Sequence, residues 1–230
     1  PGHGTGGDIN NIPLPNGDGS WDALKDTIVA ASKMAGVDPG IMATMAAIES
    51  SFRAGVSNKK SSASGLYQFI DETWATMLRK YGSKYGIAPN TPKSDPRANA
   101  LMGAEFLKEN MEYLQKHVKR PLTDVDMYAA HFMGAAGASD LLTAPSNADA
   151  VQLFPKQAVA NRDIFAPDGK HNTVAEVIQE LGRRVQSRSA KYATLARNYA
   201  GNPTTSSQVQ STGGTGSGNV PDLLMRPSAN

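Results

Sequence analysis

The sequence predicts an all-α protein. Almost no stretch alternates apolar and polar residues with period two, whereas apolar residues recur at spacings of three and four over several long segments. Helix-start signals precede these segments: a Ser at position 20 and Asp-Pro pairs at 38–39 and 95–96. We therefore expect about seven helices in one compact set, with flexible arms at both ends of the chain.

Composition excludes several classes of function. The 230 residues are enough for one substantial core, and 23 Lys and Arg against 21 Asp and Glu give a net charge of only +2. No Lys/Arg run exceeds two residues, so the sequence does not favour nucleic acid. The absence of Cys excludes thiol catalysis, disulfides and Cys-ligated zinc. No apolar run has the length of a membrane span.

The first twenty residues are rich in Gly, Pro and Asn, and we expect them to form a flexible arm. They carry no basic-then-apolar leader pattern, and the chain does not begin with Met, which suggests a processed product or an excised part. A first helix should start after Ser20, which is a plausible N-cap, and end at Gly36.

The second helix is the segment that suggests chemistry. Asp38 and Pro39 begin it, and residues 41–48 carry no charge, so the helix should be buried nearly all round. Glu49 ends the apolar run. A carboxyl group there is expected to be partly desolvated, which raises its pKa and suits a general acid. The alternative from this run alone is that Glu49 ends the helix and points into solvent.

The rest of the chain continues the helical pattern. We expect a polar loop over 53–64, with two Lys at its tip or on a groove rim, and a turn over 65–69. The later segments are a helix from Asp71, a loop over 82–95, a helix from 96, a single helix over 124–142, short helical turns over 145–172, and a long last helix capped by Asn172 or Thr173. Residues 201–230 should be a disordered linker or tail.

Three short motifs carry a family resemblance. Glu49-Ser50 ends an apolar helix, Gly-Leu-Tyr-Gln follows at 65–68, and Ala-Ala-His-Phe-Met-Gly lies at 129–134. Their order resembles the lytic transglycosylase domain of the soluble, lysozyme-like (SLT) type, over roughly residues 25–145. That resemblance implies a goose-type lysozyme-like helical fold for residues 21–200, with 146–200 as a helical extension.

The sequence departs from the family pattern at two places. Tyr67 stands where the family usually has Met, and His131 and Phe132 stand where it usually has Tyr and Asn. His131 is the only acidic or basic residue between Asp126 and Asp140. The forms SASGLYQFIDETW and AAHFMG look most like those of phage virion or phage-derived members.

The resemblance implies a reaction with one catalytic carboxyl group. Glu49 would protonate the oxygen between N-acetylmuramic acid and N-acetylglucosamine, and its carboxylate would then take the proton from the C6 hydroxyl. Ser50 and Gln68 would hold the substrate by hydrogen bonds, and Tyr67 would form a wall of the groove. We place His131 and Phe132 with these as substrate-binding residues, His131 bonding Glu49 or the sugar.

Other titratable residues have simpler expected roles. Asp71 is expected to be an N-cap and Glu72 to favour the helix dipole, and Asp124 and Asp126 should do the same for their helix. The four His are scattered without paired spacing, so we predict no metal and no cofactor.

The leading hypothesis is therefore a peptidoglycan lytic transglycosylase, whose partner is the glycan strand. It would belong to a phage virion and act in the host periplasm or cell wall, with export to the periplasm as the alternative. The arms could contact other virion proteins. Two rival hypotheses stay open: a muramidase that uses water, for which a second carboxylate facing Glu49 is required, and a non-catalytic wall-binding or structural virion component.

Overall fold

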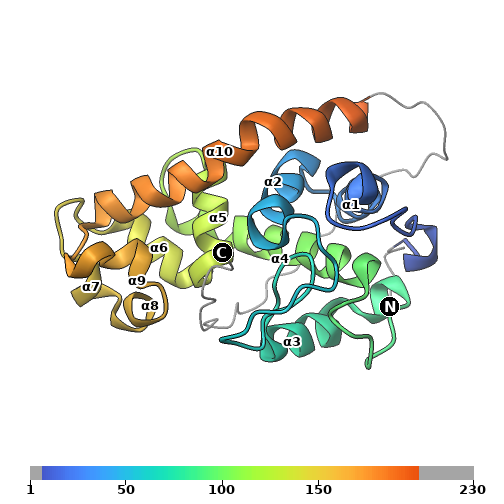
Figure 1. The fold of residues 1–230 in the computed structure, drawn as a ribbon, viewed down its shortest axis with the longest axis horizontal. Coiled ribbons are helices and arrows are strands. Elements are labelled where there is room, and N and C mark those ends of the chain that lie inside the picture. Colours follow the sequence, from blue (N-terminus) through green and yellow to red (C-terminus); the bar gives the residue numbers. More distant parts are fainter. Residues whose placement is uncertain (1–6, 202–230) are drawn as a thin grey trace. The chain divides into compact units, whose positions relative to one another are not determined.

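The computed structural model describes residues 7–201. Over this range the chain forms ten α-helices and three short 3₁₀ helices (Figure 1), and its only β-type pairings are three isolated bridges. The prediction of an all-α protein is confirmed. The predicted tail over 201–230 lies outside the described residues, apart from Gly201, which ends the last helix.

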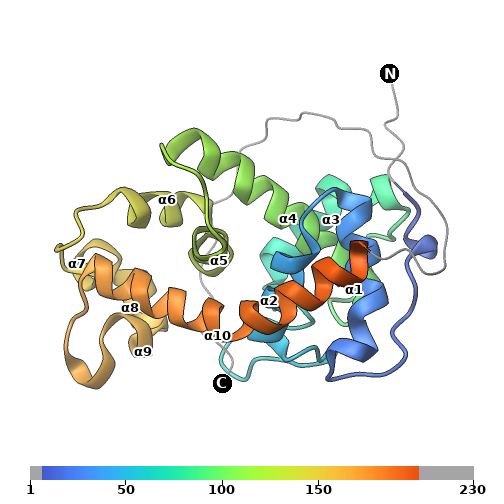
Figure 2. The same cartoon turned by 90° about the horizontal axis from the view of Figure 1, so that it is seen from above.

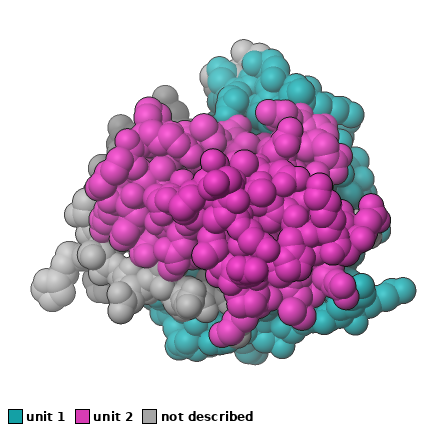
Figure 3. All heavy atoms as spheres, turned by 90° about the vertical axis from the view of Figure 1, so that its left-hand side faces the viewer, with its two compact units in different colours: residues 1–106, 188–218 teal, residues 107–187, 219–230 magenta. Residues whose placement is uncertain are grey.

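The described residues divide into two compact units (Figure 3). The first unit contains the residues up to 106 and those from 188 onward, and the second contains residues 107–187. The division falls inside the single domain expected over 21–200. Two long helices contribute residues to both units: α4 (Pro96–His117) and α10 (Val174–Gly201).

The first unit is built on three helices and the ends of the two long ones. These three are α1 (Trp21–Ala35), α2 (Pro39–Ser50) and α3 (Asp71–Tyr81), and the 3₁₀ helix η2 (Ser83–Tyr85) follows them. The side chains of Ser20 and Asp38 cap α1 and α2 as predicted, accepting the N–H of Ala23 at 3.1 Å and of Gly40 at 2.9 Å. Asp71 is not the N-cap that was expected, because α3 begins at Asp71 and is preceded by Ile70 without a side-chain cap.

The expectation of a flexible arm over residues 1–20 is wrong for residues 7–20. The 3₁₀ helix η1 (Ile9–Asn11) opens this segment, and Ile12 is buried at 1% exposure. The Thr27 hydroxyl donates to the Pro13 carbonyl at 2.7 Å, which ties the segment to α1. One buried isoleucine and one hydrogen bond thus attach this Gly- and Asn-rich stretch to the first unit.

The C-terminal part of α10 contacts both ends of α2 (Figure 2). At the N-terminal end, the Arg197 guanidinium donates to the Asp38 carboxylate, with 2.6 Å between Nη2 and Oδ2. The same guanidinium fills the space that a Cβ on Gly40 would need. Just past the C-terminal end, the rings of Tyr192 and Phe52 pack edge to face, with 4.9 Å between their centroids. A helix distant in sequence thus braces the helix that carries Glu49.

The second unit is a cluster of short helices. They are α5 (Asp124–Met133), α6 (Ala135–Thr143), α7 (Ala150–Leu153), α8 (Pro155–Ala160) and α9 (Arg162–Phe165), with the 3₁₀ helix η3 (Pro167–Gly169). The single helix expected over 124–142 is wrong: Gly134, at φ +80° and ψ 156°, breaks it into α5 and α6, which pack together.

Capping boxes begin both α5 and α10. The N-cap of α5 is Thr123 and not Asp124, which was expected in that role and is instead the first residue of the helix. Thr123 and Asp126 form a reciprocal capping box at the start of α5, and Asp126 also receives two bonds from Arg120, at 2.6 and 2.9 Å. Thr173 and Glu176 exchange two bonds of 3.2 Å at the start of α10. None of the helices within residues 7–201 is both long and apolar enough to cross a lipid bilayer.

Candidate active site

Glu49 is the penultimate residue of α2 and is only 8% exposed. The preceding turns are apolar and buried, with Met42, Ala43 and Ala46 at 0% exposure. The structure therefore excludes the alternative that Glu49 simply points into solvent. Buried carboxyl groups are concentrated at active sites, so the position of Glu49 supports a functional role.

The chain leaves α2 through strained backbone. Ser51 and Phe52 both have positive φ, at +50° and +60°, a conformation that non-glycine residues rarely adopt. Their N–H groups bond the carbonyls of Ala47 and Ala46 and close the helix. Such strain persists only where surrounding contacts impose it, and Phe52 is held at 2% exposure against Trp21. The end of α2 is thus rigidly shaped.

Ser50 is buried at 2% exposure, and its hydroxyl donates to the Ala46 carbonyl at 3.0 Å. The sequence resemblance implied that Ser50 would hold the substrate by hydrogen bonds. The hydroxyl proton is used inside the helix, and the oxygen keeps its capacity to accept a hydrogen bond. The role of Ser50 toward a substrate stays a prediction, limited in this conformation to acceptance.

The turn at 65–69 requires glycine at its first position. Gly65 has φ +86°, and a Cβ there would stand 2.2 Å from the Asn99 amide nitrogen and 2.4 Å from the Lys93 carbonyl oxygen. The Asn99 side chain receives the Tyr67 N–H at 2.9 Å and donates to Lys93 O at 2.7 Å. Asn99 on α4 therefore fixes the turn. No pattern in the sequence indicated this role of Asn99, because an Asn near a helix start is common.

Tyr67 does not form the groove wall that was expected of it. Its side chain is fully buried, at 0% exposure, and its hydroxyl donates to the Met42 carbonyl of α2 at 3.0 Å. Its ring lies against the backbone of α4 at Gly103. Burial raises the pKa of the Tyr67 phenol, which keeps the hydroxyl protonated as a donor. The Tyr that replaces the family's Met is a spacer between two helices.

Gln68 is buried at 2% exposure with positive φ, at +52°. Its amide nitrogen donates to the carbonyls of Gly65 at 2.9 Å and Val56 at 3.1 Å. Its Oε1 is buried and has no hydrogen-bond partner within the described part of the chain. A buried carbonyl oxygen without a partner is costly, so a donor supplied by a ligand would relieve it.

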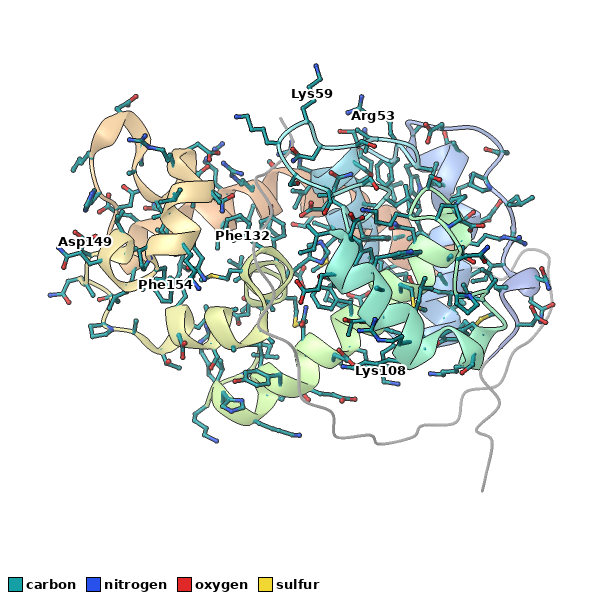
Figure 4. The ribbon with its side chains drawn as sticks, turned by 90° about the horizontal axis from the view of Figure 1, so that it is seen from below. Arg53, Lys59, Lys108, Phe132, Asp149 and Phe154 are labelled. Atoms are coloured by element: carbon teal, nitrogen blue, oxygen red, sulfur yellow. The ribbon has the colours of Figure 1, made fainter. Side chains whose placement is uncertain are left out.

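His131 and Phe132 lie on α5 in the second unit, whereas Glu49, Ser50 and Gln68 lie in the first. Both α5 side chains are buried, at 4% and 3% exposure (Figure 4 labels Phe132). Their predicted role as substrate-binding residues stays a prediction.

Two of the other carboxylates near the motifs form ion pairs in the structure. Asp71 pairs with Lys93, and Asp126 is held by Arg120 and the cap of α5. For Asp126, burial raises the pKa, but the Arg120 guanidinium and the Thr123 N–H outweigh burial and hold the pKa below its usual range. Neither group is presented as a second catalytic carboxylate.

One further buried carboxylate of the first unit was missed by the sequence reasoning. Glu105 on α4 is 2% exposed and accepts bonds from Lys84, at 2.6 Å, and from the Tyr85 hydroxyl. Burial and the adjacent Glu105 raise the pKa of Tyr85, so the phenol stays a donor. Among residues 7–201 no three His, Asp or Glu gather in a way that would hold a metal ion.

The loop after α2 carries positive charges and is exposed to solvent. Arg53 and Lys59 project from it into solvent (Figure 4), and the Lys60 N–H closes a turn on the Asn58 side chain at 2.8 Å. The lysines are thus exposed at the tip of the loop, as expected.

A buried carboxyl group at the end of an apolar helix, tied through Tyr67 to the glycine turn at 65–69, is an arrangement typical of an acid–base site. The family model described as the Transglycosylase SLT domain matches residues 26–148, more than half of the chain. The chain belongs to this family. Its type is the lytic transglycosylase, an enzyme acting on peptidoglycan, and the lysozyme-like fold class is confirmed.

Proposed function

We propose that this chain cleaves the β-1,4 bond between N-acetylmuramic acid and N-acetylglucosamine by forming a 1,6-anhydro product, with Glu49 as the only catalytic carboxyl group. The observation that carries the proposal is the buried position of Glu49 at the end of α2, 8% exposed. Two carboxylates near the motifs in the sequence, Asp71 and Asp126, are already paired with Lys93 and Arg120. A hydrolase that follows the two-carboxylate scheme needs a second, available carboxylate.

The proposed reaction uses Glu49 twice. Its protonated carboxyl group gives its proton to the bridging oxygen as the bond to the anomeric carbon breaks, which releases the N-acetylglucosamine end with a new hydroxyl group. The carboxylate then accepts the proton of the C6 hydroxyl of the same muramic acid while that oxygen bonds the anomeric carbon. Glu49 regains its proton, and no water is consumed.

Gln68 has a defined part in this proposal. Its buried Oε1 lacks a partner among the described residues, so it would accept a hydrogen bond from a sugar hydroxyl or an N-acetyl N–H. Ser50 would act as an acceptor, because its proton bonds Ala46. His131 would bond Glu49 or the substrate, and Phe132 would pack beside it.

The test is mass spectrometry of the soluble products from purified Gram-negative peptidoglycan, with wild type beside Glu49→Gln. We expect anhydro-muropeptides from the wild type alone. Reducing-end products would instead establish the muramidase alternative. No products from either protein, with both folded, would favour a non-catalytic wall-binding component.

We also propose that the chain is carried by a phage particle and acts on the host wall in the periplasm. The support is the form of two motifs, SASGLYQFIDETW and AAHFMG, which resembles that of phage members. Detection of the chain in purified virions would test this. Its presence only in the periplasm of an uninfected cell would instead identify an exported cellular enzyme.

A further inference from the structure

A groove of about 770 Å³ lies in the first unit, bounded by the start of α1, the end of α2 and the C-terminal part of α10. This volume is typical of ligand-binding clefts. The groove's aromatic and apolar lining includes Trp21, Phe52, Tyr192, Leu195 and Tyr199. Leu195 and Tyr199 lie one turn apart on α10 and are 40% and 39% exposed, so the groove presents two neighbouring apolar side chains to solvent.

One face of α10 forms a complete wall of the groove. The lining residues on this helix fall at spacings of three and four, so they make one continuous stripe: Arg188, Lys191, Tyr192, Leu195, Asn198 and Tyr199. Ala193 and Ala196 lie between the lining residues in the sequence and are buried, so they form the face of α10 that packs on the protein core. The family match ends at residue 148, so this wall is an addition to the matched range.

The groove is separate from the candidate active site. Ala47 lines it, and Glu49 stands two residues further along the same helix, which turns its side chain by about 200° around the helix axis. Glu49, Ser50 and Gln68 are not among the lining residues. Helix α2 thus presents its catalytic carboxyl group on one side and part of this groove on the other.

The aromatic walls are held in place before any ligand arrives. The Tyr192 ring packs on Phe52, and the Tyr199 hydroxyl bonds the Asp26 carboxylate. The Lys25 ammonium lies 5.2 Å from the centre of the Tyr199 ring. Fixed aromatic faces reduce the ordering cost of binding.

The charge of the lining favours an anionic ligand. Lys25, Arg188 and Lys191 contribute three cations, against the single carboxylate of Asp22. Aromatic faces stack on the C–H faces of sugar rings, Asn198 can bond hydroxyls, and the cations can pair with carboxylates.

We propose that this groove binds a second stretch of peptidoglycan, away from the bond being cut. Sugar rings would stack on Tyr199 and Tyr192, and a carboxylate of a peptide stem would pair with Lys191. The site would hold the enzyme on the insoluble polymer between cuts. The proposal rests on the proposed function only for the identity of the polymer.

The test measures binding of the full chain to insoluble peptidoglycan by sedimentation, in a Glu49→Gln background so that the polymer stays intact. Lys191→Glu with Leu195→Asp should weaken binding about five- to tenfold. The matched control is Lys33→Glu with Thr194→Asp, which makes the same charge changes at exposed positions outside the groove, and it should bind normally.

Turnover of a short soluble glycan strand by the same variants, with Glu49 restored, separates the two proposals. Unchanged turnover with weakened sedimentation supports a second site. Equal losses in both measurements, or unaltered sedimentation, would overturn it, as would tighter groove-dependent binding of single-stranded DNA than of peptidoglycan. If no variant cuts but the groove variant still binds less, the proposed reaction fails and the groove proposal stands.

Discussion

The Tyr67 hydroxyl donates a hydrogen bond of 3.0 Å to the Met42 carbonyl, and this bond attaches the 65–69 turn to the helix that ends in Glu49. Both residues are fully buried. Tyr67, which the motif resemblance placed in the substrate groove, is therefore a buried residue that holds the 65–69 turn against α2.

Removing that hydroxyl should cost stability. Tyr67→Phe leaves the ring in place and deletes one buried hydrogen bond, so the free energy of unfolding should fall by about 1 kcal/mol. Urea denaturation of the two proteins measures the difference. Equal midpoints and slopes would mean that the bond contributes nothing.

Gly103 and Tyr67 should be coupled. A Cβ at Gly103 would stand 2.8 Å from the Tyr67 ring, so Gly103→Ala should destabilise the wild type by about 1–3 kcal/mol through overpacking. The flexible side chain in Tyr67→Met should absorb the methyl group, which makes Gly103→Ala much less costly there. A double-mutant cycle by chemical denaturation checks this, and additive effects would refute it.

Glu49→Gln should separate activity from stability. Loss of the acid–base group should reduce the rate of anhydro-product formation by about 10²–10⁴-fold. Glutamine has nearly the same size and shape as a protonated glutamic acid, so the packing of this buried side chain is kept and the melting temperature should change little. Calorimetry beside the product assay measures both, and a loss of folding instead of chemistry would argue for a structural role.

The pair of Asp126 with Arg120 should make the stability depend on pH. The pKa of Asp126 is lowered on folding, so its contribution is present above its unfolded pKa of about 3.9 and is lost as the pH falls through the lower folded value. Asp126→Asn should therefore be less stable by about 1–3 kcal/mol at pH 7. The difference from wild type should shrink below about pH 4.

Urea titrations from pH 7 to pH 2 would follow this difference. Asp140→Asn, at an exposed position on α6, is the control and should leave the pH dependence unchanged. A gap between wild type and Asp126→Asn that stays constant through the acid range would contradict the assigned ion pair.

The sequence predicted the helix starts well because each rests on one local interaction. Ser20, Asp38, Thr123 and Thr173 cap their helices through bonds within three residues, and such short-range chemistry is visible in a pattern of letters. The burial of Glu49 followed similarly from an uncharged run. The break at Gly134 was missed because Ala and Gly around it looked like a tightly packed helix.

The errors in the site have a different cause. Whether Tyr67 lines a groove or fills a core depends on Asn99 and Gly103, which lie more than thirty residues away along the chain. The packing of residues 7–20 depends likewise on Ile12 meeting a core formed later in the sequence. Neither relationship leaves a periodic signal.

The contacts of α10 with both ends of α2 determine how short a fragment containing Glu49 can be made. A piece cut to the matched range, 26–148, would lack Arg197 and Tyr192, leaving Asp38 without its guanidinium and Phe52 with one face bare. It would also lose the Ser20 cap of α1 and the Pro13 carbonyl that accepts the Thr27 hydroxyl. The smallest autonomous enzyme is therefore longer than the region by which its relatives are recognised.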